Sequence, residues 1–480
     1  MLDATDKPID EPRRQAAEAR EFLAACGVGQ SRQGGNTKYL AVVEAIEAGI
    51  QTGSLVAGTQ LPPQREIAGF FGTTVATVTK AIGEAARRGL IVARAGSGTY
   101  VASKDAAGLP GAGGLVDLSL NVPPVTVTAE IVAAALRRVA KADDPAALFD
   151  YAPVAGQPAN REAGVALLAM RGLQVDADDV VITQGAHQGL ITALMAVARP
   201  GDSVACERVN YTGLRRIAEM LQLRLFGVDT DGEGMDAKQL AAVLRSSGAK
   251  AIVCTPTCQN PTSVTMTHER RTEVVEAARS AGVPLIEDDI YGLLCGEGLP
   301  PLAALWPDGV IYVTSLSKCV APGLRIGYLH APAAVAARVR DVSFALGWAE
   351  PSLQAALATE LIRSGDASRC AGLHRAEAKR RVAMAQQALG KGVIAASQAP
   401  SYHLWVSTGN ARSGEVTAEL SRRGILVSSG SHFVVDDSAS PHALRISLGG
   451  RVSPDNLKSA LQEIATVLVG SRARSLGSIV

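Results

Sequence analysis

The sequence predicts an α/β protein with more than one domain. At 480 residues, the chain is longer than a single ordinary core requires. From Leu115 onward, short apolar runs rich in β-branched residues alternate with Ala-rich segments of helical periodicity, and this alternation predicts a mostly parallel sheet with helices packed on it. Before that stretch, residues 36–101 combine three short helical patterns with one hairpin signal.

The continuous apolar runs of the longer part are typical of strands that are buried on both faces. Polar and Ala-rich segments of helical spacing separate them, as in a chain that crosses repeatedly from strand to helix to strand. We expect buried strands at 180–183, 203–206, 251–255, 283–288 and 310–315.

The composition narrows the class of protein. Hydrophobic residues make up 47% and charged residues 19%, which is typical of a globular chain. The formal net charge of +1 gives no whole-chain indication of nucleic-acid binding. No apolar run reaches the length of a membrane span, and the acidic first segment lacks the apolar stretch of a signal peptide. We therefore expect a cytoplasmic protein with no membrane contact.

The seven cysteines form neither a disulfide framework nor a metal-ligand pattern. Cys254 and Cys258 come closest to a pair, but no second Cys or His pair at ligand spacing accompanies them. We expect buried thiols and no metal site.

Four zones follow one another along the chain. Residues 1–35 are polar and are expected to form a flexible extension, and residues 36–101 a compact domain. Residues 102–116 are small and Gly-rich, which predicts a linker. The large α/β domain is expected over residues 117–480.

The compact domain has a recognisable order of elements. We expect helices from Tyr39 to Ile50, from about Gln64, and over VATVTKAIGEAARRGL, with Thr73 or Thr74 as the N-cap of the third. The segment IVARAGSGTYV then predicts two short strands around a Gly-containing turn. Three helices followed by a β-hairpin are the outline of a winged helix-turn-helix.

This block resembles the signature of the GntR family of transcription regulators: a G-x-L-x-x-G-x-x-L-P-x-x-R-E-x-A run, a recognition helix, and an R-R-G-L segment followed by G-S-G-T-x-V. The matching residues are Gly53, Leu55, Gly58, Leu61, Pro62, Arg65, Glu66, Ala68, Thr77, Val78, Gly89, Leu90, Gly96, Gly98, Thr99 and Val101.

The resemblance implies that the domain binds operator DNA. Its candidate DNA-binding residues are Arg65, Thr74, Thr77, Lys80, Arg94 and Ser97. The family commonly carries Ser-Arg at the turn into the recognition helix, whereas this chain has Thr74-Val75, so one expected phosphate contact is missing. Because the local positive charge is modest, we expect a dimer that presents two such domains to DNA. The alternative is a small accessory domain with no role in DNA binding.

The most informative segment of the large domain is VTSLSKCVAPGLRIGYL, residues 313–329. Lys318 follows a strand-like run and precedes Pro322-Gly323, a position unlike that of a solvated surface lysine. Burial among cations would favour its neutral amine, which suits an imine-forming lysine. A Ser–Lys pair of the β-lactamase type would also require Ser-Asp-Asn and Lys-Thr-Gly, and neither tripeptide occurs.

The segment resembles S-x-S-K-x-x-x-P-G-x-R-x-G of the fold type I pyridoxal-phosphate enzymes. The resemblance implies a fold type I aminotransferase-like domain with pyridoxal 5'-phosphate as cofactor and Lys318 as the catalytic residue that links it. Ser315 and Arg325 would hold the cofactor phosphate, since a dianion suits a guanidinium and a hydroxyl donor.

Other segments match the same family in the expected order. In EDDIYGLL, Asp288 would pair with the pyridinium nitrogen and Tyr291 with the ring hydroxyl. In PTCQNPTS, Asn260 would also bind the ring hydroxyl. In TQGAHQGL, the amides of Gly185 and Ala186 would bind the phosphate at the start of a helix.

Three further residues complete the implied set. Tyr211 in ERVNYTGL would stack on the cofactor ring. Tyr151 in YAPVAGQPANREA would reach the phosphate of the neighbouring subunit, which implies a homodimer with shared, domain-swapped sites. Arg445 in ALRISLGG is the candidate for binding the substrate carboxylate, because a guanidinium pairs with it through two hydrogen bonds.

Together the two halves resemble the MocR subgroup of GntR regulators. The resemblance implies a transcriptional regulator whose effector, an amino acid, an amine or pyridoxal phosphate itself, is sensed through aldimine chemistry at Lys318. An active aminotransferase with an accessory winged helix remains an alternative, as does a DNA-binding protein that senses pyridoxal phosphate alone. The sequence does not specify the effector, the operator or the sign of regulation.

Overall fold

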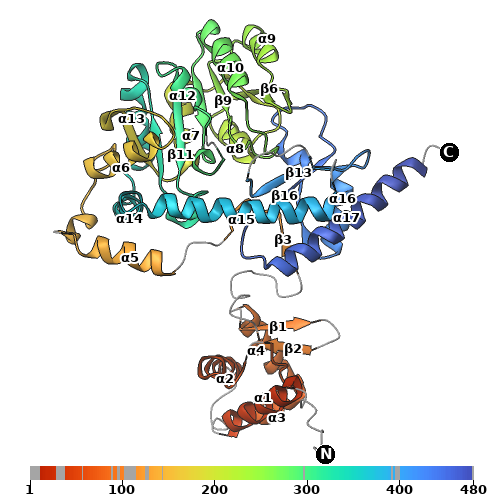
Figure 1. Ribbon diagram of the computed structural model, residues 1–480. Helices are drawn as coiled ribbons and strands as arrows, with labels where there is room; N and C mark the ends of the chain where they lie inside the picture. Colours follow the sequence, from red (N-terminus) through yellow and green to blue (C-terminus); the bar gives the residue numbers. More distant parts are fainter. Residues whose placement is uncertain are drawn as a thin grey trace, which may run out of the picture. The chain divides into compact units, whose positions relative to one another are not determined.

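The computed structural model describes most of the chain, in ranges listed at the end of this paragraph. It divides into two compact units, with the boundary between Leu115 and Val116, and each unit is considered by itself (Figure 1). The described residues are 11–28, 38–56, 58–87, 90–94, 98–101, 115–124, 129–142, 144–295, 298–390, 393–394 and 400–477.

The smaller unit is a winged helix-turn-helix, as expected. Its elements are α1 (Glu11–Val28), α2 (Lys38–Thr52), α3 (Gln64–Phe70), α4 (Val75–Arg87), β1 (Ile91–Arg94) and β2 (Gly98–Val101). The two strands pair antiparallel from Ile91 opposite Val101 to Arg94 opposite Gly98. Apolar side chains from all four helices and both strands form one core, in which Val42, Ile67 and Val78 are fully buried.

The expectation of a flexible N-terminal extension is wrong for residues 11–28. They form α1, which packs against α2 and α3. Ala19 and Leu23 are fully buried, and Phe22 and Cys26 pack beside them. These four residues share one helical face, an apolar stripe that the polar composition of the segment concealed.

The larger unit is built on a seven-stranded sheet of order β4-β12-β11-β10-β9-β5-β6. All its strands are parallel except β12, which pairs antiparallel with both β4 and β11. The strands are β4 (Val180–Thr183), β5 (Ser203–Glu207), β6 (Arg224–Val228), β9 (Ala251–Cys254), β10 (Leu285–Asp288), β11 (Val310–Ser315) and β12 (Gly327–His330).

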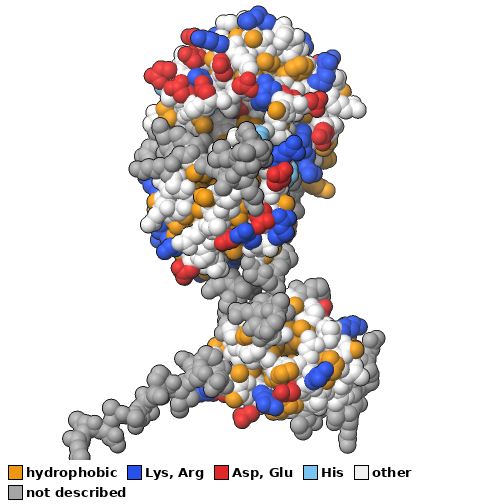
Figure 2. All heavy atoms as spheres, turned by 90° about the vertical axis from the view of Figure 1, so that its right-hand side faces the viewer, with side chains coloured by type: hydrophobic (Ala, Val, Ile, Leu, Met, Phe, Trp, Pro, Cys, Tyr) orange, Lys and Arg blue, Asp and Glu red, His pale blue; other side chains and the backbone are white. Residues whose placement is uncertain are grey.

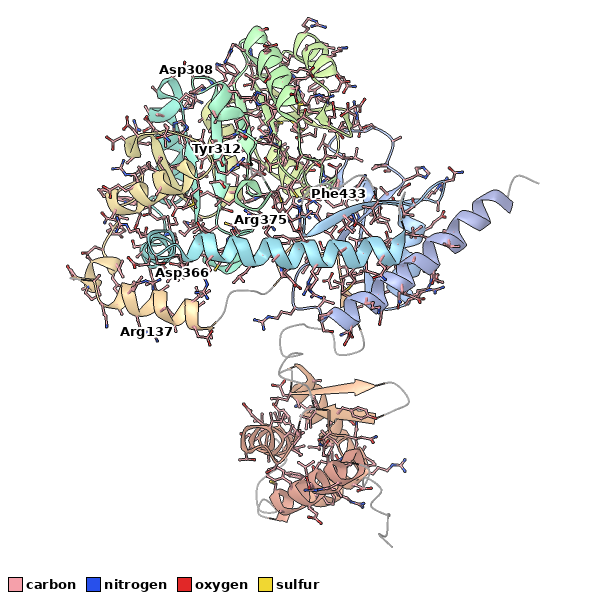
Figure 3. The ribbon with its side chains drawn as sticks, in the orientation of Figure 1. Arg137, Asp308, Tyr312, Asp366, Arg375 and Phe433 are labelled. Carbon is pink, nitrogen blue, oxygen red and sulfur yellow. The ribbon has the colours of Figure 1, made fainter. Side chains whose placement is uncertain are left out.

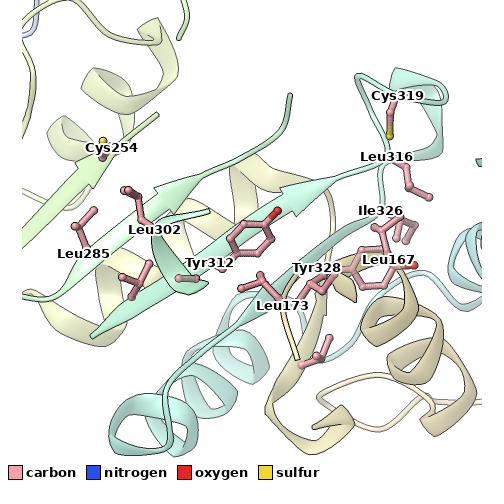
Figure 4. Close-up of a cluster of buried hydrophobic side chains, with 14 of the residues drawn as sticks. Leu167, Leu173, Cys254, Leu285, Leu302, Tyr312, Leu316, Cys319, Ile326 and Tyr328 are labelled. Atoms are coloured by element: carbon pink, nitrogen blue, oxygen red, sulfur yellow. The ribbon is translucent and has the colours of Figure 1, made fainter. Parts of the chain in front are cut away.

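Helices cover both faces of this sheet. Alternate strand residues, such as Val181 and Ile182, enter opposite cores because successive side chains of a strand point to opposite faces. One face packs against α7 (Ala186–Val197), α8 (Thr212–Met220) and α13 (Ala333–Gly347). The other packs against α5 (Ala129–Ala140), α6 (Pro158–Ala169), α9 (Ala237–Ser247), α10 (His268–Ala281), α12 (Leu302–Leu305) and α14 (Ser352–Arg363). Figure 4 shows part of the second core, with Tyr312, Tyr328 and Leu285 on neighbouring strands.

The C-terminal part of the chain forms a second, smaller sheet within this unit. β13 (His403–Ser407), β16 (Ala443–Ser447) and β15 (Ser428–Ser429) form an antiparallel sheet. β14 (Ile425–Leu426) pairs with β3 (Val116–Asp117), so the last residue of the expected linker is already part of this unit. α15 (Asp366–Leu389), α16 (Ser413–Arg422) and α17 (Pro454–Gly477) cover these strands.

Short elements complete the unit. They are β7 (Thr230–Asp231), β8 (Gly234–Met235), α11 (Gly292–Cys295) and the 3-10 turns Pro145–Phe149, Ala177–Asp179, Pro322–Leu324 and Gly430–Phe433. Charged side chains of both signs are intermixed over one face of the larger unit (Figure 2). Within the described residues, no helix is long and apolar enough to cross a membrane.

Candidate cofactor and ligand site

Most of the sequence-predicted site residues of the larger unit lie at or just beyond the carboxyl ends of the parallel strands, whereas Arg445 lies on β16. β4 ends just before Gly185, β10 ends at Asp288, and β11 ends three residues before Lys318. Ligands of open parallel sheets bind at the carboxyl ends of strands, because loops from several strands meet there. The fold therefore brings together segments that are far apart in the sequence.

Lys318 is partly buried and fixed from two directions. Its Nζ donates to the carbonyl oxygen of Asn121, and the hydroxyl of Tyr402 donates to its own carbonyl oxygen at 2.7 Å. Burial lowers the pKa of Lys318 to about 8, assisted by the positive charges of Arg445 and Arg325 and opposed by Asp288. A substantial fraction of the amine is therefore neutral near physiological pH, as a nucleophilic lysine requires.

Asp288 is buried, and its Oδ1 has no hydrogen-bond partner among the described residues. Burial raises the pKa of Asp288 to about 7, and the neighbouring Asp289 adds to the increase. Asp289 is already paired: it accepts from Arg171 Nε at 2.9 Å and from the Tyr312 hydroxyl at 2.7 Å. Each of the two adjacent acids keeps a buried Oδ1 without a partner among the described residues. Asp289 is held through its Oδ2 by Arg171 and Tyr312, which gives it a structural role and leaves Asp288 as the acid more available to a ligand.

Tyr291 is fully buried and belongs to a small polar network. The amide Nδ2 of Asn121 donates to the Tyr291 hydroxyl at 2.7 Å and lies 3.2 Å from His403 Nδ1. His403 Nε2 lies 3.1 Å from the carbonyl oxygen of Gln259, which can only accept, so Nε2 carries the proton and Nδ1 accepts. Because Tyr291 accepts from Asn121, its own hydroxyl hydrogen remains available to a ligand.

Asn260, in the loop after β9, and Arg445, on β16, contact each other. Arg445 Nη1 donates to Asn260 Oδ1 at 3.1 Å, and Nη2 donates to the carbonyl oxygen of Ser119. The guanidinium also lies 4.8 Å from the ring centroid of Phe433. Figure 3 labels Phe433 beside the sheet of β13, β16 and β15. Arg445 is only 7% exposed and its Nε has no partner among the described residues, so it retains a buried donor for an anion.

A separate group of residues forms a candidate anion site at the start of α7. Gly185 has φ +82° and precedes the helix, with Ala186 as its first residue. The positive φ favours glycine at this position, and a Cβ there would lie only 3.1 Å from Nη2 of Arg325, so the guanidinium packs closely against Gly185. Ser315 is buried, and its Oγ accepts from the amide of Ser317 at 3.3 Å. The Ser317 Oγ is buried without a partner, which makes it an additional donor that the sequence analysis missed.

Tyr211 directly precedes α8 as its N-cap residue and is held by the loop before it. Glu207, at the end of β5, accepts from Asn210 Nδ2 at 2.7 Å, and Asn210 Oδ1 accepts from the amide of Tyr211 at 2.6 Å. The Tyr211 ring packs edge-on against His187 with 6.2 Å between centroids. Burial and the charge of Arg325 lower the pKa of His187, which favours its neutral form.

Tyr151 is not part of this cluster. Its side chain is 87% exposed and stacks on Trp348 at 5.5 Å. Phe149 is also 87% exposed, and Phe344 lies 4.8 Å from Trp348. Tyr151, Trp348 and Phe344 form an exposed surface, which we call the aromatic patch.

Four of the candidate DNA-binding residues of the smaller unit lie on or next to α3 and α4. Arg65 is exposed on α3, and Thr74 caps α4 by accepting from the Thr77 amide at 3.2 Å. The hydroxyls of Thr74 and Thr77 also hydrogen-bond each other at 2.9 Å, and Lys80 Nζ lies 4.3 Å from the centre of the Tyr39 ring. The backbone of Arg94 ends β1, and Ser97 lies outside the described residues.

Asn121 is the clearest functional residue that sequence reasoning missed. It contacts Lys318, Tyr291 and His403 at once, yet it is separated from Lys318 by 197 positions. No local pattern in LSLNVPP connects it to either partner. Only the unusual presence of a polar residue before a Pro pair could have drawn attention to it.

The lowered pKa of Lys318 can be tested in the protein without any bound ligand. In cofactor-free protein, competitive acetylation of Lys318, followed by mass spectrometry, should have a midpoint near pH 8 rather than near the ordinary lysine value of about 10.4. Arg445→Gln should move the midpoint up, because a cation that lowers the pKa is lost. Asp288→Asn should move it down, because a carboxylate that raises the pKa is lost. Shifts in the same direction, or an ordinary lysine midpoint, would contradict this assignment.

The chain matches two protein families. Residues 38–101 match the bacterial regulatory proteins of the gntR family, and residues 114–464 match aminotransferase class I and II. The chain is 27% identical to the uncharacterized HTH-type transcriptional regulator YdeF of Bacillus subtilis, over 90% of this chain and 94% of that protein. It is 30% identical to the pyridoxine biosynthesis transcriptional regulator PdxR of Corynebacterium glutamicum, over 61% of this chain and 65% of that protein.

Solved structures agree with the fold of the larger unit. An archaeal alanine:glyoxylate aminotransferase superposes with a TM-score of 0.69 at 23% identity, over 82% of this chain and 95% of that one. The Pyrococcus horikoshii kynurenine aminotransferase, solved with PMP, also superposes with a TM-score of 0.69 at 23% identity. The match covers 77% of this chain and 96% of that one. The chain thus belongs to the class I and II aminotransferase family through its larger domain and to the GntR family through its N-terminal domain, the combination of the MocR subgroup.

Proposed function

We propose that this protein is a pyridoxal-phosphate-dependent transcriptional regulator that binds operator DNA and responds to an amino acid or amine. The observation that carries the proposal is the cluster of Lys318, Asp288 and Arg445 in a chain that also has a GntR-type DNA-binding domain. The relatives at similar length are HTH-type transcriptional regulators, which supports a role in transcription rather than in metabolism alone. Such a role places the protein in the cytoplasm, where its DNA is.

The residues fit pyridoxal phosphate at both ends of the cofactor. The buried, unpartnered Oδ1 of Asp288 matches a protonated ring nitrogen, and Tyr291 retains a hydrogen for a ring oxygen. Gly185, Arg325 and the Ser317 hydroxyl match a phosphate. When bound, pyridoxal phosphate supplies an aldehyde that reacts with amines and a ring that withdraws electrons. Lys318 would hold it through its amine, of which a substantial fraction is neutral, and Asp288 would hold the proton on the ring nitrogen.

An amino acid is the effector class that the site favours over pyridoxal phosphate alone. Arg445 is buried and has an unused Nε, although its other nitrogens already contact Asn260 and Ser119. A buried guanidinium without a carboxylate partner among the described residues suits the carboxylate of an amino acid. An amine without that group would leave this charge uncompensated.

The aromatic patch supports a homodimer. Tyr151, Phe344 and Trp348 expose a contiguous apolar area, and Phe149, two residues before Tyr151, is also exposed. A second copy of the chain is the occupant that agrees with the resemblance, in which Tyr151 would reach the cofactor phosphate of the neighbouring subunit. Each site would then be completed by both chains, as in a domain-swapped arrangement.

Arg65 gives a test of the DNA-binding part. Arg65→Ala should weaken the binding of specific and random DNA alike and should reduce the slope of log affinity against log salt by about one, because a phosphate contact is sequence-independent. Thr77→Ala, on the recognition helix, should mainly affect the specific site. Arg14→Ala is the matched control, since Arg14 is exposed on α1 and pairs with Glu18. Equal losses in the Arg14 and Arg65 variants would mean that Arg65 makes no particular contact.

A working aminotransferase is the second candidate, because Lys318, Asp288, Tyr291 and Arg445 all lie in the cofactor cluster, as the resemblance to the aminotransferases implies. Absorbance spectra of the purified protein with a panel of amino acids, followed over minutes, distinguish the two. A shifted band that persists supports sensing. Conversion to the pyridoxamine form with release of a keto acid supports transamination, and this outcome would displace the regulator as the primary role.

A further inference from the structure

The recognition helix α4 presents an unusual face. Its exposed residues are Val75, Ala76, Thr79, Lys80 and Gly83, which recur at helical spacing, while Val78, Ala81 and Ile82 are buried in the core. Val75 is 43% exposed although it is a large apolar residue. In helix-turn-helix proteins, the N-terminal residues of the second helix contact base edges in the major groove.

The polar groups of this face are largely committed within the domain. The hydroxyl of Thr79 lies 2.7 Å from Gln64 Oε1 and 2.9 Å from the carbonyl oxygen of Val75, both of which only accept. The Thr74 hydroxyl bonds to Thr77. Lys80 is the single cation among residues 75–82, and it rests on the ring of Tyr39.

What remains for a partner is a surface of methyl groups. The side chains of Val75 and Ala76 are entirely aliphatic, and Thr79 adds a methyl once its hydroxyl hydrogen is used. Reading guanine normally requires Arg or Lys, and reading adenine requires Asn or Gln, whereas the 5-methyl of thymine is read by apolar contact. The first two turns of α4 carry no Arg, Asn or Gln.

We propose that α4 selects A·T pairs by packing Val75 and Ala76, with the methyl of Thr79, against thymine methyl groups in the major groove. The inference rests on the proposed DNA-binding function and specifies its target. In this arrangement Val75 determines sequence specificity, while Arg65 contacts the phosphate backbone of the DNA. Each buried methyl should contribute about a fourfold preference for thymine over uracil, from the usual free energy of burying one such group.

The test uses the full-length protein loaded with pyridoxal phosphate. Binding sites are first selected from a pool of random duplexes, and each thymine of the selected site is then replaced singly by deoxyuracil, which removes only the methyl. We expect A·T pairs at neighbouring positions of each half-site and about a fourfold loss of affinity at one or more of these thymines. Val75→Ala should abolish the thymine preference at one position and leave the others unchanged.

Two further variants sharpen the result. Val56→Ala is the matched control, because Val56 is a valine of similar exposure, 46%, that lies outside α4. It should keep the full thymine preference. Val75→Arg should change the selected base at the same position to guanine.

The outcomes separate the inference from the function on which it rests. If no site is selected, the proposed DNA-binding function fails. If a site is selected but uracil is tolerated throughout, or Val75→Ala keeps the wild-type preference at every thymine, DNA binding stands and the methyl-reading inference is overturned. The same holds if the selected half-sites lack thymine.

Discussion

Lys318→Ala should abolish the covalent attachment of pyridoxal phosphate to the chain. In the wild-type protein, borohydride should fix the cofactor to one peptide, and mass spectrometry should place it on Lys318. The reason is that this amine is partly buried, has a pKa lowered to about 8, and lies near the unpartnered carboxylate of Asp288. The visible absorbance of the bound cofactor should disappear in the same variant.

Lys250→Ala provides the control, because Lys250 is exposed and lies away from the strand ends that form the site. It should retain full attachment. Cofactor still fixed to the chain in the Lys318 variant would identify a different lysine as the anchor, and the site as described would be wrong.

Arg445→Ala should weaken amino-acid binding on the order of a hundredfold while changing the affinity for pyridoxal phosphate much less. A pair of hydrogen bonds between a buried guanidinium and a carboxylate contributes about 3 kcal/mol. Titration of the cofactor spectrum with amino acids measures this loss directly. We expect the cofactor itself to be held by Lys318, Asp288 and the anion site near Gly185, so its binding should survive.

Arg451→Ala is the matched control for this experiment. Arg451 follows the same strand but is exposed to solvent. Its replacement should leave amino-acid titrations unchanged. An unaltered titration in the Arg445 variant would point to another carboxylate-binding group or to an effector without a carboxylate.

Much of the fold could be predicted because its signals are local. The strands β4 and β11 are continuous apolar runs, and they occupy the residues expected for them. The recognition helix likewise begins where Thr74 can cap it. Segments such as the one around Lys318 carry chemistry-bearing residues at short spacing, so a pattern in one stretch of sequence is enough to propose them as site residues.

The remaining features depend on contacts between distant segments. β6 is an edge strand with exposed and half-buried residues, and β12 is a short strand whose place between β4 and β11 is fixed only by long-range pairing. Asn121 acquires its role because the segment after β3 passes beside Lys318 and Tyr291. The apolar stripe of α1 was present in the sequence, but the many charged residues around it obscured its periodicity.

We expect ligand binding at Lys318 and Arg445 to change how the proposed dimer holds DNA. A ligand can do this only if its affinity differs between two arrangements of the protein. The most direct measurement is footprinting of the cofactor-loaded, full-length protein on the DNA around its own gene, with and without the amino acid that shifts its spectrum. We expect a protected site with two half-sites and an affinity that changes about fivefold or more when the amino acid is added. Absence of any protected site, or a site whose affinity no amino acid alters, would contradict ligand-gated regulation.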